Sequence, residues 1–200
     1  MASKSLMVLV LLIGLCGCEF GGNPAGTVLK QAALALEKND ASAFVAQFDL
    51  KACAANEIKN ITEANEALST LDQLGKSLGL GGMEDLLGNV FDVERKLRQD
   101  FARKVSTGEL ALECQRQEKP GCPWVPESLR RGELVSLSES AAVARVTSPK
   151  KLTTWLALAK EGEAWRIVGW AVLKDVAEAY ARGENKPEKK PTPKKQPLEL

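Results

Sequence analysis

The chain has 200 residues, of which 44% are hydrophobic and 26% are charged. This balance is typical of one globular domain with tails, and it excludes the disordered and collagen-like classes. Lysine and arginine total 27 against 26 aspartate and glutamate residues, so no overall positive field would attract nucleic acid. Histidine, the commonest general base and metal ligand, is absent. We therefore expect no nucleic-acid partner and no histidine-dependent catalysis, and the sequence indicates no metal or cofactor.

A short hydrophobic segment follows the amino terminus. Lys4 precedes a largely apolar run from Leu6 to Leu15. A membrane-spanning helix needs about 20 apolar residues, so the length of this run is typical of the core of an export signal. The sequence therefore predicts an export leader over residues 1–17. An ordinary secretory signal and a buried hydrophobic helix are the alternatives to a lipoprotein leader.

The leader ends in Leu15-Cys16-Gly17-Cys18. This segment resembles the lipobox of bacterial lipoproteins, which has an aliphatic residue, two small residues and then cysteine. The resemblance implies transfer of a diacylglyceryl group to the Cys18 thiol, cleavage after Gly17 and acylation of the new amino terminus. Residues 13–16 form a poorer box that competes with it. Several acyl chains would hold the protein on a membrane permanently, because each buried methylene contributes about 0.8 kcal/mol.

Lipidation would anchor the chain on the cell membrane, facing the periplasm or the exterior. Glu19 follows the lipid-bearing cysteine, whereas an aspartate at that position resembles the inner-membrane retention signal of some diderm bacteria. In a diderm host the sequence therefore favours the outer membrane. Residues 18–24 would form the lipidated linker to the folded domain.

Export would place the remaining cysteines in a compartment where disulfides persist. Cys114 and Cys122 flank Pro120 and Gly121, a turn signal, and a bridge between them would stabilise the fold by roughly 2 to 3 kcal/mol. Pairing of Cys53 with either of them, or three reduced thiols, are the alternatives. An unpaired Cys53 is expected to be a small buried residue, because a catalytic thiolate needs a neighbouring base.

Helical periodicity dominates the first half of the folded region. Helices are expected over residues 25–38, from Asp40 past Phe48, through a third segment that ends near Gly75, and from Met83 to about Ser106, with a break at 79–82. Asp40 is the expected N-cap of the second segment, in which Phe44 and Phe48 lie four residues apart on one side. Thr107 and Gly108 are expected to end the long helix.

Alternation of apolar and polar residues dominates the second half. Short antiparallel strands are expected over residues 110–114, 134–137, 141–147, 152–160 and 164–170, and a closing helix over 173–181. Residues 160–163 form the clearest hairpin turn. Trp165 and Trp170 have opposite strand parity, so at most one should face the core in a regular strand. Because helices come first and strands afterwards, the expected fold class is α+β, formed by one domain over residues 25–182.

Two longer stretches, LEKNDASAFVAQF in the helical half and WLALAKEGEAWRIVGW in the strand half, carry a further resemblance. With the leader, they resemble exported members of the cystatin-like α+β roll superfamily, which includes nuclear transport factor two and ketosteroid isomerase. The resemblance implies amphipathic helices packed on a curved antiparallel sheet, here with a long helical insert over residues 56–106. Enzymes of that superfamily use a cavity between helices and sheet. By this analogy the expected cavity lining is Phe44, Phe48, Leu97, Phe101 and Trp165.

No catalytic residue is marked by the sequence. The single tyrosine, Tyr180, falls in the closing helix, and the aspartates lie at caps and on solvated helix faces. Residues 183–200 are rich in lysine and proline, a composition typical of a disordered tail that contacts anionic surfaces weakly. We therefore expect a membrane-anchored, non-catalytic module that binds a protein or a small molecule. The alternatives are a histidine-free enzyme with a roll cavity and a structural spacer between membrane and cell wall.

Overall fold

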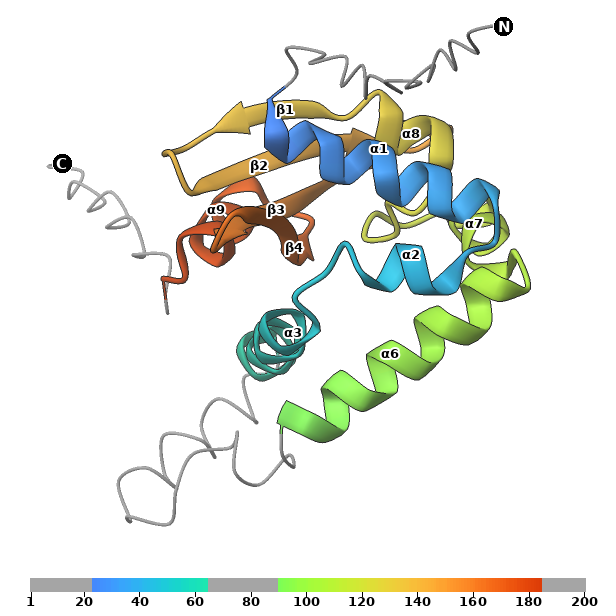
Figure 1. The fold of residues 1–200 in the computed structure, drawn as a ribbon, viewed down its shortest axis with the longest axis horizontal. Helices are drawn as coiled ribbons and strands as arrows, with labels where there is room; N and C mark the ends of the chain where they lie inside the picture. Colours follow the sequence, from blue (N-terminus) through green and yellow to red (C-terminus); the bar gives the residue numbers. More distant parts are fainter. Residues whose placement is uncertain (1–22, 65–89, 185–200) are drawn as a thin grey trace, which may run out of the picture.

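A computed structural model describes residues 23–64 and 90–184 of the chain (Figure 1). The predicted leader and lipid anchor, the predicted break at 79–82 and most of the predicted tail lie outside these residues. Within the described ranges, no helix has both the length and the hydrophobicity that crossing a membrane requires.

The described elements follow the order that the sequence predicts, with helices first and a sheet afterwards. In chain order they are α1 (Pro24–Glu37), α2 (Ala41–Val45), α3 (Leu50–Ala64), α6 (Val90–Ser106), α7 (Glu109–Arg116), α8 (Pro126–Arg130), β1 (Glu133–Ser136), β2 (Ala141–Thr147), β3 (Thr153–Glu161), β4 (Ala164–Ala171) and α9 (Lys174–Arg182). The strands form one antiparallel sheet in the order β1-β2-β3-β4. The predicted α+β class is confirmed, with the N-terminal helices packed on a curved C-terminal sheet.

Side-chain caps fix the starts of the first two helices. The Asn23 side chain accepts a hydrogen bond from the Ala25 amide at 3.1 Å, and Pro24 occupies the first helical position. The Asp40 carboxylate accepts a hydrogen bond from the Ala43 amide at 2.9 Å, which confirms Asp40 as the N-cap of α2. Between the helices, Asn39 has a φ of 53°, a conformation that asparagine tolerates better than most residues. These caps explain the sharp corner between α1 and α2.

The strand predicted over residues 110–114 is wrong, because this segment is part of helix α7. Leu110 and Cys114 are one helical turn apart and both are buried, whereas Leu112 is 50% exposed. A run of five residues fits both the helical and the strand period. Good helix-forming residues and an acidic first turn decide in favour of the helix. Ion pairs from α6 to α7, Lys104 with Glu113 at 2.6 Å among them, hold the two helices together.

Strands β2, β3 and β4 are covered on both faces, and alternate residues of these strands belong to different packing layers, whereas β1 is largely exposed. On one face the sheet packs against α1, α2 and the helices that follow them, through Ala142, Ala144, Val146, Leu156, Leu158 and Ile167. On the other face it packs against α9, through Ala141, Val143, Ala157, Val168 and Ala171. Figure 1 shows α1 running along the sheet and α9 packed against it at the carboxyl end of the domain. The predicted hairpin turn is confirmed, since Gly162 begins a two-residue loop with a φ of 59°.

A β-bulge interrupts strand β4. Ala157 of β3 pairs with Gly169, but the next residue, Leu158, pairs with Ile167, so Val168 is the extra residue. The bulge reverses the alternation of side chains beyond it. Trp165 and Trp170 consequently both pack against the main core, as partly buried side chains. The prediction that at most one of them faces the core is therefore wrong, because it assumed a regular strand.

The bulge also leaves a site that only glycine fills without strain. A Cβ atom on Gly169 would lie 3.0 Å from Cδ2 of Tyr180 and 3.2 Å from Nδ2 of Asn56. Both side chains are held by hydrogen bonds, from Nδ2 of Asn56 to the Val168 carbonyl at 2.8 Å and from the Tyr180 hydroxyl to the Asn56 carbonyl at 3.3 Å. Packing of α3 and α9 against β4 therefore depends on this glycine.

We predict that Gly169→Ala lowers the free energy of unfolding by about 1 to 3 kcal/mol, the usual cost of inserting a methyl group into a packed site. Chemical denaturation followed by circular dichroism measures this change. Gly26→Ala in α1 is the matched control, because no atom lies within 4 Å of its Cβ position and alanine favours the helix by about 0.5 to 1 kcal/mol. Equal stability of the two variants would contradict the prediction.

Candidate ligand-binding groove

The segment between α2 and α3 closes the exposed edge of strand β4. Phe48 forms a parallel bridge with Ile167, in which the Ile167 amide donates to the Gln47 carbonyl at 2.9 Å. The Asp49 amide then donates to the Ile167 carbonyl at 3.0 Å. An uncovered edge strand would present unpaired backbone groups, so this short pairing both protects β4 and fixes α2 beside it.

Helix α3 continues the closure with side chains. The Cys53 thiol lies 3.4 Å from the Ile167 carbonyl, to which it donates, and Asn56 bonds the Val168 carbonyl at the bulge. Cys53 is 1% exposed and unpaired. Burial raises the pKa of the Cys53 thiol far above its usual range, and the neighbouring carboxylates of Asp49 and Glu57 raise it further. Cys53 is thus the small buried residue that the sequence predicts, and its thiol stays protonated.

An aromatic cluster fills the space between α2, α6 and the sheet. Its members are Phe44, Phe48, Phe101, Trp124 and Trp170, and adjacent ring centroids are 4.9 to 6.1 Å apart. Trp124 contacts each of the other four rings and is 3% exposed. Tilted and edge-to-face contacts at these distances stabilise a core beyond the area they bury. Trp124 was not among the residues predicted to line the cavity, because Trp124 lies in an irregular segment without periodicity.

The residues predicted to line a cavity have different places in this arrangement. Phe44, Phe48 and Phe101 contact one another in the aromatic cluster, with Phe44 fully buried. Leu97 and Trp165 pack on the same core as partly buried side chains. The structure therefore brings the predicted residues to one core region. Phe48 also contributes to an open groove on the outer side of the cluster.

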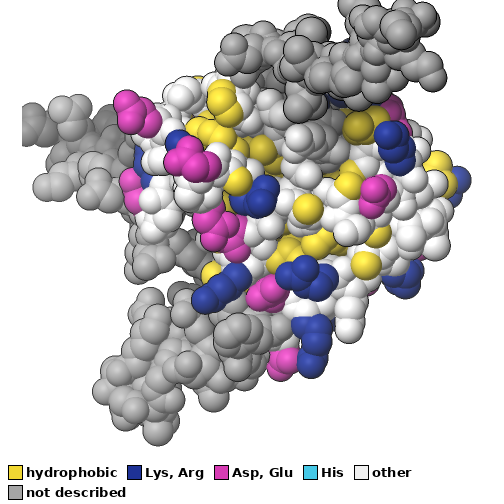
Figure 2. Space-filling view, viewed as in Figure 1, with side chains coloured by type: hydrophobic (Ala, Val, Ile, Leu, Met, Phe, Trp, Pro, Cys, Tyr) yellow, Lys and Arg dark blue, Asp and Glu magenta, His cyan; other side chains and the backbone are white. Residues whose placement is uncertain are grey.

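This groove, the α2–α6–β4 groove, has a volume of about 680 Å³. It is lined by Ala41, Ser42, Val45, Ala46, Phe48, Arg98, Ala102 and Arg166. Small and apolar side chains form most of its wall, and the two charged residues of the lining are both arginines. Figure 2 shows hydrophobic side chains exposed beside lysine and arginine side chains on the face where α2 and α6 run. Its volume lies within the range of small-molecule sites, although it is open to solvent on one side.

The two arginines of the groove differ in their partners. Arg98 on α6 donates to the Glu94 carboxylate at 3.0 Å, one helical turn away. Arg166 on β4 is half-buried, and its guanidinium donates a hydrogen bond to the backbone carbonyl of Trp165 at 3.5 Å. No carboxylate of the described ranges pairs with Arg166. Among the described residues, Arg166 is therefore the arginine of the groove that no carboxylate neutralises.

A second hollow lies between α3, α9 and the sheet, beside Tyr180. It has a volume of about 400 Å³, and the Tyr180 hydroxyl at its side donates to the Asn56 carbonyl. The acidic residue of its lining, Glu184, is exposed.

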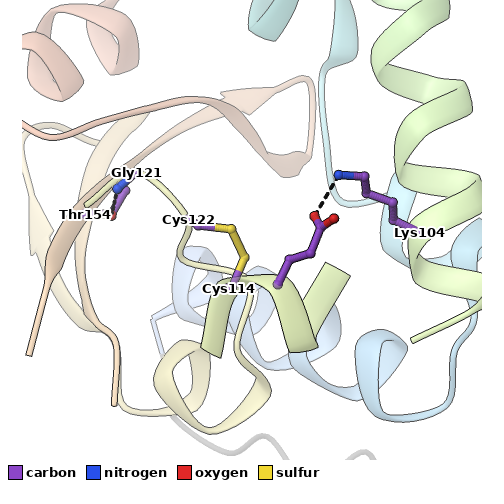
Figure 3. Close-up of a disulfide and its surroundings, with 6 residues drawn as sticks. Lys104, Cys114, Gly121, Cys122 and Thr154 are labelled. Carbon is purple, nitrogen blue, oxygen red and sulfur yellow. Dashed lines mark hydrogen bonds and ion pairs between the residues drawn. A yellow bond between two sulfur atoms is a disulfide. The ribbon is translucent and has the colours of Figure 1, made fainter. Parts of the chain in front are cut away.

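A disulfide orders the segment that holds Trp124. Cys114 of α7 and Cys122 are joined, with their Cα atoms 5.2 Å apart, which is the local pairing that the sequence favours (Figure 3). Gly121 donates its amide to the buried hydroxyl of Thr154 at 2.9 Å. The bridge and this hydrogen bond thus fix residues 121–124 against α7 and β3.

Comparison of the chain with family models, with curated proteins and with solved structures found no match. The resemblance to lipoproteins and to cystatin-like rolls therefore stays a prediction from the sequence, and the groove has to be interpreted from its own chemistry.

We predict a pH effect at Glu57, whose pKa burial raises above the unfolded value of about 4.3. Between the two values the folded state binds more protons than the unfolded state, so stability falls as pH rises through this window. Glu57→Gln, which stays neutral, should match the wild type below the window and exceed its stability above it. Thermal unfolding from pH 3 to 8 measures the difference. Glu139→Gln, in the exposed β1–β2 turn, is the control. An equal change in the pH dependence of stability in both variants would contradict the assignment of this effect to Glu57.

Proposed function

We propose that this protein is an exported, lipid-anchored module of the bacterial cell envelope that binds a ligand without transforming it. The observation that carries the binding role is the α2–α6–β4 groove, where Arg166, which has no carboxylate partner among the described residues, lies beside an apolar wall. Desolvating such a charge is costly unless it gains a partner, so a ligand that supplies one is favoured.

Export is supported by two independent features. The leader over residues 1–17 and the box that ends at Cys18 resemble those of lipoproteins. The Cys114–Cys122 bridge also supports export, because disulfides persist in oxidising compartments and are rare where thiols are kept reduced. Asn23, where the described chain begins, is five residues after Cys18, a span of at most about 18 Å. A lipid on Cys18 would therefore hold the domain close to the membrane surface.

A binding role also fits the state of the groups that a catalyst would need. The Cys53 thiol is buried and its pKa is raised, so it is a poor nucleophile. Tyr180 donates its hydroxyl proton to a backbone carbonyl and packs against the glycine at the bulge. Both groups serve the closure of the β4 edge, which explains their burial without invoking a reaction.

We predict that mass spectrometry of the mature protein, purified from membranes, finds diacylglycerol and an acyl chain on Cys18. Cys18→Ala should leave the leader uncleaved and the protein without lipid. Cys16→Ala is the matched control, since it changes the neighbouring cysteine and improves the box with a small residue. Lipid retained in the Cys18 variant and lost in the Cys16 variant would overturn the assignment in favour of residues 13–16.

We further predict that the mature protein carries a small molecule. Native and denaturing mass spectra of the same sample should differ by a mass that is lost when the protein unfolds. Equal masses under both conditions, after gentle extraction with a non-ionic detergent, would contradict this prediction, because they would show that no small molecule stays bound through purification.

A further inference from the structure

We propose that the α2–α6–β4 groove binds a single-chain carboxylate amphiphile, a fatty acid in chemical class, with Arg166 pairing the carboxylate. This inference rests on the proposed binding function and adds the chemistry of the ligand. Three observations carry it: the state of Arg166, the engagement of the carboxylates around it, and the apolar wall that extends away from it.

Arg166 stands out among the arginines of the described chain. Seven of the others form ion pairs with aspartate or glutamate: Arg95, Arg98, Arg103, Arg130, Arg131, Arg145 and Arg182. Arg116 and Arg166 do not. Arg116 is exposed, so water solvates its charge, whereas Arg166 is half-buried in the wall of the groove. A half-buried guanidinium with open donors is a preformed site for a carboxylate, which it binds with two parallel hydrogen bonds.

Three carboxylates on α6 or beside α2 have other partners. Glu94 accepts from Arg98, Asp40 caps α2 through the Ala43 amide, and Asp49 accepts from the Ala52 amide at the start of α3. None of them is available to neutralise Arg166 without giving up a hydrogen bond that the fold uses. We therefore expect the counter-charge of Arg166 to be negative and to come from a bound ligand.

The rest of the groove favours a hydrocarbon chain. Val45, Phe48 and three alanines line it, and only one hydroxyl, that of Ser42, adds a polar group that is not charged. A small polar anion such as phosphate would leave this wall in contact with water, and it would find one free guanidinium where phosphate sites usually provide several donors. A carboxylate with one alkyl chain uses both parts, since burial of apolar surface contributes roughly 25 cal/mol per Å². The volume of about 680 Å³ lies within the range of small-molecule sites.

Radiolabelled dodecanoate below its micellar concentration tests the proposal by equilibrium dialysis. The mature protein is held in phosphatidylcholine nanodiscs, and uptake by empty nanodiscs is subtracted. Dodecanol, which has the same chain without the charge, is measured in parallel. Wild-type protein should bind dodecanoate saturably. Arg166→Gln should weaken this binding by about tenfold or more, the usual loss for a charge-assisted hydrogen bond, and should leave dodecanol binding unchanged.

Two further variants separate the groove from general effects. Ala102→Leu, which fills the α6 wall with a good helix former, should weaken binding of both dodecanoate and dodecanol. Arg116→Gln removes the exposed unpaired arginine and should change neither. Thermal unfolding of each variant, compared with the wild type, shows that the fold is kept.

The inference is overturned if Arg166→Gln binds dodecanoate as tightly as the wild type, or if wild-type binding is not saturable. It is also overturned if Arg116→Gln loses as much affinity for dodecanoate as Arg166→Gln does. These outcomes are distinct from failure of the binding function itself. A native mass difference that persists in the Arg166→Gln variant would keep the proposed function and reject the carboxylate ligand. Equal native and denatured masses together with saturable dodecanoate binding would keep the groove chemistry and show that the ligand is lost on purification.

Discussion

Closure of the β4 edge is the constraint on which the rest of the fold depends. No further strand lies beside β4 among residues 23–64 and 90–184, where a short segment between two helices pairs with Ile167 instead. That pairing sets the positions of α2 on one side and α3 on the other. Cys53 and Asn56 then satisfy the carbonyls that the bulge exposes. The buried Cys53 thiol thus adds a second donor to the Ile167 carbonyl, and the partly buried Asn56 amide supplies the Val168 carbonyl with a hydrogen bond at the bulge.

The bulge at Val168 connects this edge to both layers of the core. It turns Trp170 toward Trp124 and Phe101, and it turns Gly169 toward Tyr180 of α9. One extra residue in β4 therefore gives the aromatic cluster its fifth ring and gives α9 a close approach to the sheet. The disulfide stabilises the same cluster from the other direction, because it fixes the segment that ends in Trp124. The core is consequently held by covalent, aromatic and backbone constraints that converge on β4.

The sequence was sufficient for features that depend on local patterns. Helix α1, the Asp40 cap, the hairpin turn and the strands from β1 to β4 follow from periodicity and turn residues that tertiary contacts reinforce. It failed where five residues fitted two periods, in α7, and where a bulge changed the parity of Trp170. Neither Trp124 nor Arg166 could be assigned to a site in advance, because their significance depends on partners far away in the chain, or on the lack of them. The groove itself arises from the pairing of residues 47–49 with β4, and no local sequence pattern predicts this pairing.

The way the groove is built decides which of its residues can report on function. Phe48 and the α2 wall belong to the segment that closes the β4 edge, so substitutions there would disturb the fold and the groove together. Arg166 and Ala102 lie on β4 and α6, and neither side chain takes part in the edge pairing. One supplies the charge of the groove and the other part of its apolar wall. Closing the sheet does not require an arginine at this position, and a half-buried guanidinium loses part of its hydration unless it gains a partner. Among the described residues no carboxylate supplies that partner, and this is the physical argument for a ligand in the proposed groove.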